Sequence, residues 1–176
     1  MKGQAMRILI SAASKHGATG QIAQRVADTL TEAGLETVVI PAEQVTTLTG
    51  FDAVVLGSAV YMGHWLAPAR DLAERLAREA DGRPVWLFSS GPLGDPPKPE
   101  QDAVDVAPLL AATGARGHQV FSGRLVRKQL SFPERAVTAA LRVADRDDRD
   151  WTEIAAWARK IGEALSAETT ETPRST

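Results

Sequence analysis

The chain has 176 residues, of which 44% are hydrophobic and 24% charged, a composition typical of one globular domain with a sizeable core. The formal net charge of −2 favours neither a nucleic-acid partner nor a strongly acidic electron carrier. Because there are no cysteines, disulfides, thiolate metal sites, iron–sulfur clusters and cysteine nucleophiles are excluded.

Neither the start of the chain nor its apolar runs indicate a targeting or membrane segment. No apolar stretch approaches the roughly 20 residues that a membrane span needs, and residues 1–5 lack the apolar region of a signal peptide. We therefore expect a cytoplasmic protein. The histidines are His16, His64 and His118, and their spacing is not that of metal ligands, so no metal site is expected.

Short apolar runs alternate along the chain with segments of helical periodicity. Strands are predicted at residues 6–10, 37–40, 53–56, 85–88 and 117–121. Helices are predicted at 21–30, from Pro68 to residue 76, and at 100–113 with a kink at Pro108. This alternation predicts an α/β protein with a doubly wound, five-stranded parallel sheet in the order 2-1-3-4-5 and helices on both faces.

Residues 123–150 are predicted to form an insertion after the last strand. Ser131 and Glu134 have the spacing of a capping box, which predicts a helix inside it. Asp150 opens a final helix, whose apolar stripe we interpret as core. The stripe consists of Ile154, Trp157, Ala158, Ile161 and Leu165. We expect a single domain over residues 1–166 and a disordered tail at 167–176.

The first strand leads through a loop rich in hydroxyls and glycine into a helix. Backbone N–H groups and the helix dipole favour an anion at such a position, although Ser and Gly also serve for capping and turning alone. The loop is neither a P-loop nor a dinucleotide fingerprint. Its S-x-x-G-x-T pattern resembles the flavodoxin phosphate loop, in which amides and hydroxyls wrap the phosphate of FMN. The candidate phosphate ligands are Ser14, Lys15, His16, Gly17, Ala18 and Thr19.

Two further loops are expected at the same edge of the sheet, because the carboxyl ends of parallel strands lie together. Small residues there would let backbone amides approach a flat ring, and aromatic side chains would cover its face, as an isoalloxazine ring requires. Tyr61 and Trp65 could instead pack in the core, and His64 could be a solvated helix-start residue. The candidate ring contacts are Ser58, Ala59, Val60, Tyr61, Met62, Gly63, His64, Ser89, Ser90 and Gly91.

The three loops together resemble the flavodoxin family over residues 6–165. Within it, A-S-K-H-G-A-T (13–19), G-S-A-V-Y-M-G-H (57–64), V-F-S-G-R-L (120–125) and R-D-W (149–151) resemble the menaquinone-dependent protoporphyrinogen dehydrogenase branch. The resemblance implies a flavodoxin-like fold and noncovalently bound FMN, with the phosphate on residues 14–19 and the ring between 58–64 and 89–94.

Three functions remain open at this point. The first is an FMN-dependent oxidoreductase with a small-molecule or quinone partner, in which the flavin carries the chemistry and His64 is a candidate catalytic side chain. The others are an electron carrier and a flavin-free binding module. No acidic residue occurs from 106 to 133, whereas Arg124, Arg127 and Lys128 do. These cations are either a solvated face or a docking site for anionic lipid or porphyrin carboxylates, and no nucleic-acid partner is expected.

Overall fold

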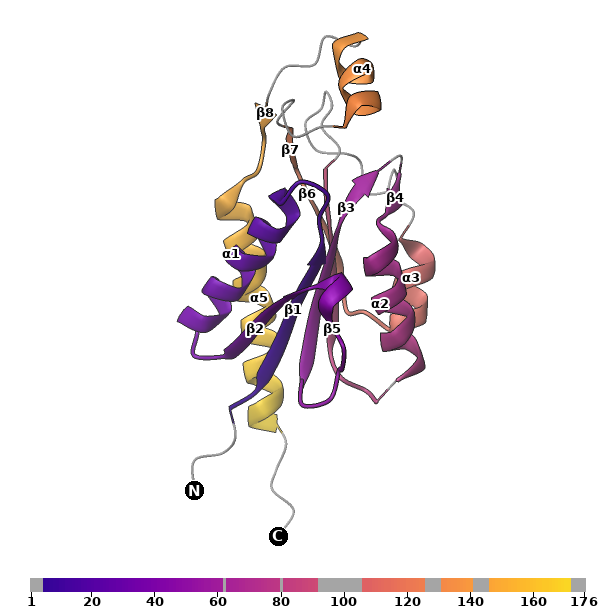
Figure 1. The fold of residues 1–176 in the computed structure, drawn as a ribbon. Helices are drawn as coiled ribbons and strands as arrows, with labels where there is room; N and C mark the ends of the chain where they lie inside the picture. The colour runs from indigo at the N-terminus through magenta and orange to yellow at the C-terminus, as the bar shows by residue number, and fades with distance from the viewer. Residues whose placement is uncertain are drawn as a thin grey trace.

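The computed structural model describes residues 5–61, 63–79, 81–91, 106–125, 131–140 and 146–171. These residues form an α/β sandwich in which one sheet lies between two layers of helices (Figure 1).

The sheet contains five parallel strands in the order β2-β1-β3-β5-β6. Their bounds are β1 Arg7–Ala13, β2 Glu36–Pro41, β3 Ala53–Tyr61, β5 Val85–Ser90 and β6 His118–Phe121. When only the parallel strands are numbered along the chain, their order in the sheet is 2-1-3-4-5, as predicted. The predicted total of five is wrong, because β3 continues past residue 56 and folds back as β4 (His64–Trp65), an antiparallel sixth strand. A separate ribbon pairs β7 (Arg124–Leu125) with β8 (Arg146–Asp147).

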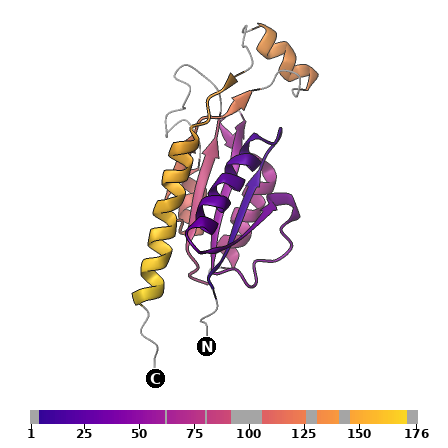
Figure 2. The ribbon, with the colours of Figure 1, turned by 90° about the vertical axis from the view of Figure 1, so that its left-hand side faces the viewer.

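Successive side chains of β1 point to opposite faces of the sheet, so the core has two layers. Ile8 and Ile10 face α1 (Ala18–Glu32) and α5 (Trp151–Glu171), whereas Leu9 faces the opposite side, where α2 (Ala67–Arg78) packs. The 3₁₀ turn η1 (Ala42–Gln44) and α3 (Ala107–Thr113) complete that second layer. Figures 1 and 2 show the two helical layers on either side of the sheet, as predicted.

The helix boundaries correct two predictions. Pro108 lies in the first turn of α3, where its missing N–H costs no hydrogen bond, so it does not kink the helix. Residues 100–105 of the predicted helix are outside the part that the structure describes. The expected disordered tail is wrong up to Glu171, because α5 continues to that residue. An ion pair between Arg116 and Glu168 ties this extension to the sheet.

The first layer is closed by an aromatic cluster on β5, β6 and α5. The rings of Phe88, Phe121 and Trp157 lie with centroids 5.5 to 6.0 Å apart. Gly57 is the register partner of Phe88 on β3, and a Cβ at Gly57 would overlap the Phe88 ring. Gly57 is therefore a packing requirement of this core.

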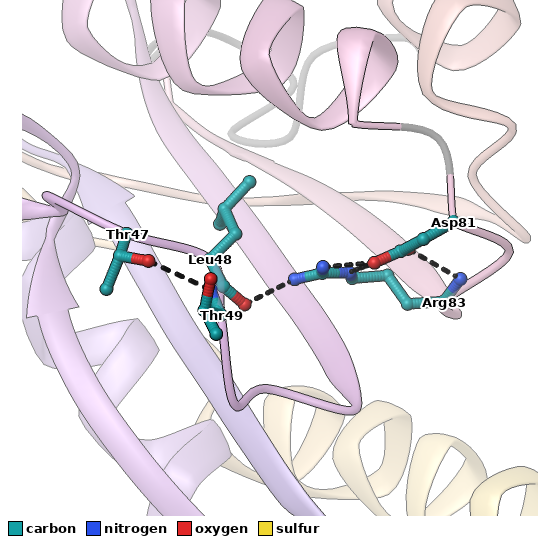
Figure 3. Close-up of polar contacts among 5 residues, drawn as sticks. All are labelled: Thr47, Leu48, Thr49, Asp81 and Arg83. Carbon is teal, nitrogen blue, oxygen red and sulfur yellow. Dashed lines mark hydrogen bonds and ion pairs between the residues drawn. The ribbon is translucent and has the colours of Figure 1, made fainter.

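Side-chain cations bind backbone carbonyls at the amino edge of the sheet. Arg83, just before β5, donates from Nη1 to the Leu48 carbonyl at 2.6 Å and pairs with Asp81 (Figure 3). This guanidinium lowers the pKa of the Asp81 carboxyl. Arg75 of α2 donates to the Val45 carbonyl at 2.6 Å. The Arg83 contact joins the loops that precede β3 and β5, at the edge opposite the candidate site, and the Arg75 contact ties α2 to the first of these loops.

Candidate functional site

The predicted loops do converge at the carboxyl edge of the sheet. In register, Ala13 at the end of β1 lies beside Ser58 of β3, which lies beside Ser89 of β5. The chain leaves β1 to form β2 on one side and β3 on the other, so the strand order reverses here. Such a reversal is where ligands bind in open α/β sheets.

The loop between β1 and α1 ends on Gly17, which has φ +84° and is the N-cap of α1. This left-handed conformation is accessible to glycine without strain. No side chain caps α1, and its first turn contains no acidic residue. Thr19 lies in that turn and is 2% exposed. The helix therefore presents backbone N–H donors and a buried hydroxyl position at the end of β1.

The other long helix of this layer begins differently. Asp150 caps α5 as predicted, with Oδ1 accepting from the N–H groups of Thr152 and Glu153 at 2.9 Å each. Its first turn also holds an acidic residue, Glu153. An anion at the start of α5 would meet these carboxylates, whereas none lies in the first turn of α1.

A fourth residue that the sequence does not predict, Glu134, lies beside Lys15 and His16 at this edge. Lys15 Nζ donates to Glu134 Oε1, and His16 Nε2 lies 3.7 Å from Glu134 Oε2. Lys15 Nζ also lies 4.6 Å from the Tyr61 ring centroid. The Lys15 hydrogen bond lowers the pKa of the Glu134 carboxyl to about 2.

Glu134 comes from α4 (Phe132–Ala140), the helix of the insertion. The predicted capping box is present, because the Ser131 N–H donates to Glu134 Oε2 at 2.7 Å. The capping role is sufficient to explain a glutamate at position 134. The sequence contains no pattern that would indicate its contact with Lys15, 119 residues away.

The segment predicted as a ring-binding loop is a hairpin. Ser58, Ala59, Val60 and Tyr61 belong to β3, and His64 pairs with Tyr61 across a turn that contains Gly63 at φ +80°. Extension of β3 is favoured because β4 supplies a partner for its last residues. Met62 is outside the residues that the structure describes.

The hairpin directs its side chains to different environments. Tyr61 is 50% exposed and His64 is exposed, so neither packs in the core. Val60 is buried. Ser58 is buried as well, and its hydroxyl donates to the Ala59 carbonyl at 2.8 Å and accepts from the Leu66 N–H at 2.9 Å. Of the predicted ring contacts that the structure describes, Tyr61 is therefore the exposed aromatic side chain.

Ser89 and Ser90 lie inside β5 and are buried, which differs from their predicted loop position. Ser89 Oγ accepts from the buried Trp65 Nε1 at 2.7 Å and lies 2.7 Å from His118 Nε2. While it accepts from Trp65, that hydroxyl can still donate its own proton to an unprotonated His118 Nε2. Burial lowers the pKa of His118 to about 4. This network fastens the β4 hairpin to the sheet.

Gly91 closes the described part of the third loop. It has φ +70°, and its N–H donates to the Phe121 carbonyl at 3.0 Å. A Cβ on Gly123 would come within 2.9 Å of the Gly91 Cα, so the insertion leaves the sheet through a close backbone contact. Residues 92–105 are not among those described.

Arg149 holds the returning arm of the insertion against α1. Its Nη1 donates to Gln21 Oε1 at 2.5 Å and to the Ala18 carbonyl at 3.4 Å, and its Nε and Nη2 bind Asp147 at 2.8 and 2.6 Å. Arg149, with a smaller contribution from Arg124, lowers the pKa of the Asp147 carboxyl. Arg124 and Asp147 are register partners in the β7–β8 ribbon. Arg127 and Lys128 lie in 126–130, which the structure leaves undescribed.

The described residues contain neither a metal-binding cluster nor a membrane-spanning helix. No three His, Cys, Asp or Glu side chains within these ranges lie close enough to hold a metal ion. No helix in the same residues combines the length and apolar character needed to span a bilayer.

The sheet order and the ligand edge at the reversal define a flavodoxin-like α/β protein. The flavodoxin domain family matches residues 9–151, and the chain belongs to that family. No protein among those with curated descriptions matches this sequence.

Solved structures show the same fold at low sequence identity. A Streptococcus pneumoniae flavodoxin is 22% identical with a TM-score of 0.58, over 93% of this chain and 99% of that one. Rubredoxin oxygen:oxidoreductase from Desulfovibrio gigas is 14% identical with a TM-score of 0.64, over 94% of this chain and 38% of that one. A Fusobacterium nucleatum flavodoxin bound to flavin mononucleotide is 18% identical with a TM-score of 0.50, over 65% and 68% of the two chains.

Proposed function

We propose that this chain binds FMN at the carboxyl edge of its sheet and acts as an FMN-dependent oxidoreductase. The observation that carries the proposal is the loop between β1 and α1, where an uncapped helix N-terminus follows Gly17 beside the exposed Tyr61. Family membership and the FMN-bound neighbour support the same cofactor.

The residues of the loop fit a phosphate group. His16 Nε2 is buried and makes no hydrogen bond within the described residues, where Glu134 Oε2 lies 3.7 Å away, and a phosphate oxygen would supply one. The hydroxyls of Ser14 and Thr19, the charge of Lys15 and the first N–H groups of α1 would hold the remaining oxygens. Tyr61 would lie at the ring.

The chemistry divides between cofactor and protein. FMN, when bound, supplies the exchange of electrons with a substrate. The chain binds the phosphate, orients the ring against the β3–β4 hairpin, and limits access of water from the side of the sheet. The exposed His64 is a candidate for contact with the substrate.

The motif resemblance extends the proposal to a substrate, protoporphyrinogen, with a quinone as electron acceptor. The net charge of −2 supports an enzyme over a small electron carrier, because carriers commonly use strong acidic fields to steer toward basic partners.

Absorbance spectroscopy of the purified chain tests the cofactor. We expect a flavin spectrum, or its appearance on adding FMN, with weaker binding of FAD and riboflavin. Reduction by protoporphyrinogen and reoxidation by menaquinone would support the enzyme. Reduction only by protein partners or artificial donors would favour an electron carrier, and a chain that stays colourless with FMN would be a flavin-free binding module.

The same proposal includes a docking surface on the insertion for an anionic amphiphile, formed by Arg124, Arg127 and Lys128. Changing all three to Gln should leave FMN affinity intact and reduce turnover or binding to anionic vesicles. Added salt should produce a similar loss in the parent, because exposed charges are screened over about 8 Å at physiological ionic strength. Unchanged turnover and vesicle binding would make the insertion structural.

A further inference from the structure

The insertion contacts the proposed phosphate loop through the carboxylate of Glu134. Glu134 Oε1 accepts from Lys15 Nζ, and Oε2 lies 3.7 Å from His16 Nε2. The Glu134 side chain is 11% exposed, so water screens its charge only partly. In Figure 1, α4 stands beyond the ends toward which the strands run, above the edge that carries this loop.

The carboxylate is charged under all ordinary conditions. Its hydrogen bond with Lys15 and the Ser131 N–H both stabilise the ionised form, and they hold the pKa of Glu134 at about 2. The groups that face it include Lys15 and His16 from the loop and the Ser131 N–H at the start of its own helix. A fixed negative charge thus lies against Lys15 and His16, the two side chains that a bound phosphate would use.

We propose that Glu134 competes with the cofactor phosphate for Lys15 and His16, and that the insertion thereby sets FMN affinity. The proposal rests on the proposed FMN site. A phosphate dianion at the start of α1 would be repelled by this carboxylate and would need the same donors, so binding requires Lys15 to leave Glu134. The released Lys15 would also leave the Tyr61 ring, above which Glu134 now holds it.

The second contact of the insertion with α1 does not depend on this exchange. Arg149 binds Gln21 and the Ala18 carbonyl in the first turn of the same helix, and its other nitrogens bind Asp147. No contact of Arg149 uses Lys15, His16 or Glu134. Release of Glu134 would therefore free the α4 end of the insertion while its returning arm stays on α1.

The test uses Glu134→Gln in the full chain. Glutamine at this position retains the capping-box hydrogen bond, so the change removes the charge and keeps the local structure of α4. We expect FMN affinity, measured by quenching of flavin fluorescence, to rise about ten-fold, as expected when a nearby like charge is removed at intermediate dielectric. Affinity for riboflavin, which lacks the phosphate, should stay unchanged.

Two controls isolate the mechanism. Glu32→Gln makes the same change in net charge at the exposed far end of α1 and should leave FMN affinity at the parent value. In a Lys15→Gln background, the gain from Glu134→Gln should be smaller, because competition for Lys15 is gone and only the repulsion between the carboxylate and the phosphate is removed.

The outcomes separate this inference from the function on which it rests. Equal FMN affinity in the parent and in Glu134→Gln would overturn the inference and leave the FMN site standing. Weaker binding would overturn it too, and would make Glu134 a positioning residue for Lys15. If no variant binds FMN, the proposed function fails. Inorganic phosphate, titrated by calorimetry, then decides whether Glu134→Gln alone binds the anion more tightly, and equal binding overturns the inference.

Discussion

His118 should make the stability of this fold depend on pH in a range where few other groups titrate. The imidazole is partly buried at the start of β6, where Ser89 Oγ lies 2.7 Å from Nε2. Burial lowers its pKa from 6.5 to about 4, so the folded chain holds His118 neutral where the unfolded chain would protonate it. The unfolded state therefore binds more protons between these two values, and stability must fall as the pH is lowered through this window.

The size of the effect follows from the two pKa values. Between pH 7 and pH 5 this one group should reduce the free energy of unfolding by about 2 kcal/mol, since each pKa unit corresponds to about 1.4 kcal/mol. Carboxyl groups with a lowered pKa, such as Glu134 at about 2, change the free energy of unfolding mainly below pH 5, because their pKa in the unfolded chain is near 4.

Urea denaturation of the cofactor-free chain at pH 7 and pH 5 measures the effect. His118→Gln should lose most of the difference between the two pH values, whereas His64→Gln, which changes an exposed histidine on the hairpin, should keep it. If the parent and His118→Gln lose the same stability on acidification, the interpretation of His118 as a buried neutral base is refuted.

Four further substitutions test the packing and the site. Gly57→Ala should destabilise the fold by about 1–3 kcal/mol in thermal or urea unfolding, because its Cβ meets the Phe88 ring. Asp150→Ala should cost about 1 kcal/mol in the same assay through loss of the α5 cap. Thr19→Val should weaken FMN binding by about 1–3 kcal/mol in a fluorescence titration, and unchanged affinity would remove its hydroxyl from the site. Tyr61→Ala should alter the spectrum or reduction potential of bound flavin with little loss of stability, because the side chain is half exposed.

The parallel order and the layers could be predicted from the sequence because they follow from local patterns. Apolar runs that alternate with helical segments predict parallel strands covered by helices on both faces. The rules for connections between such strands then allow only a few strand orders in the sheet. The cap at Asp150 and the capping box at Ser131 and Glu134 were predicted from spacing alone, and both are present. In each case the residues that decide the structure are close together in the chain.

The β3–β4 hairpin could not be predicted in the same way. The apolar run that predicts the third strand ends at residue 56, and Gly57, Ser58 and Ala59 after it are weak strand formers, so the sequence predicts a loop there. In the structure Gly57 and Ser58 are buried in β3, Phe88 packs over Gly57, and Trp65 reaches Ser89 from β4. Strand formation here depends on partners from β5 and β4, and the strand propensity of the segment itself does not indicate such partners.

The direction of the strands explains why the candidate site lies at one edge only. On the way to the amino edge, the loop before β3 exposes carbonyl oxygens, and Arg75 and Arg83 bind them. At the carboxyl edge, the chain passes from β1 into the start of α1 and presents N–H donors that no side chain caps. A parallel sheet thus concentrates donors for an anion at the edge where its order reverses, and the insertion places Glu134 beside those donors. The same geometry that creates the phosphate site therefore also gives an internal carboxylate access to it.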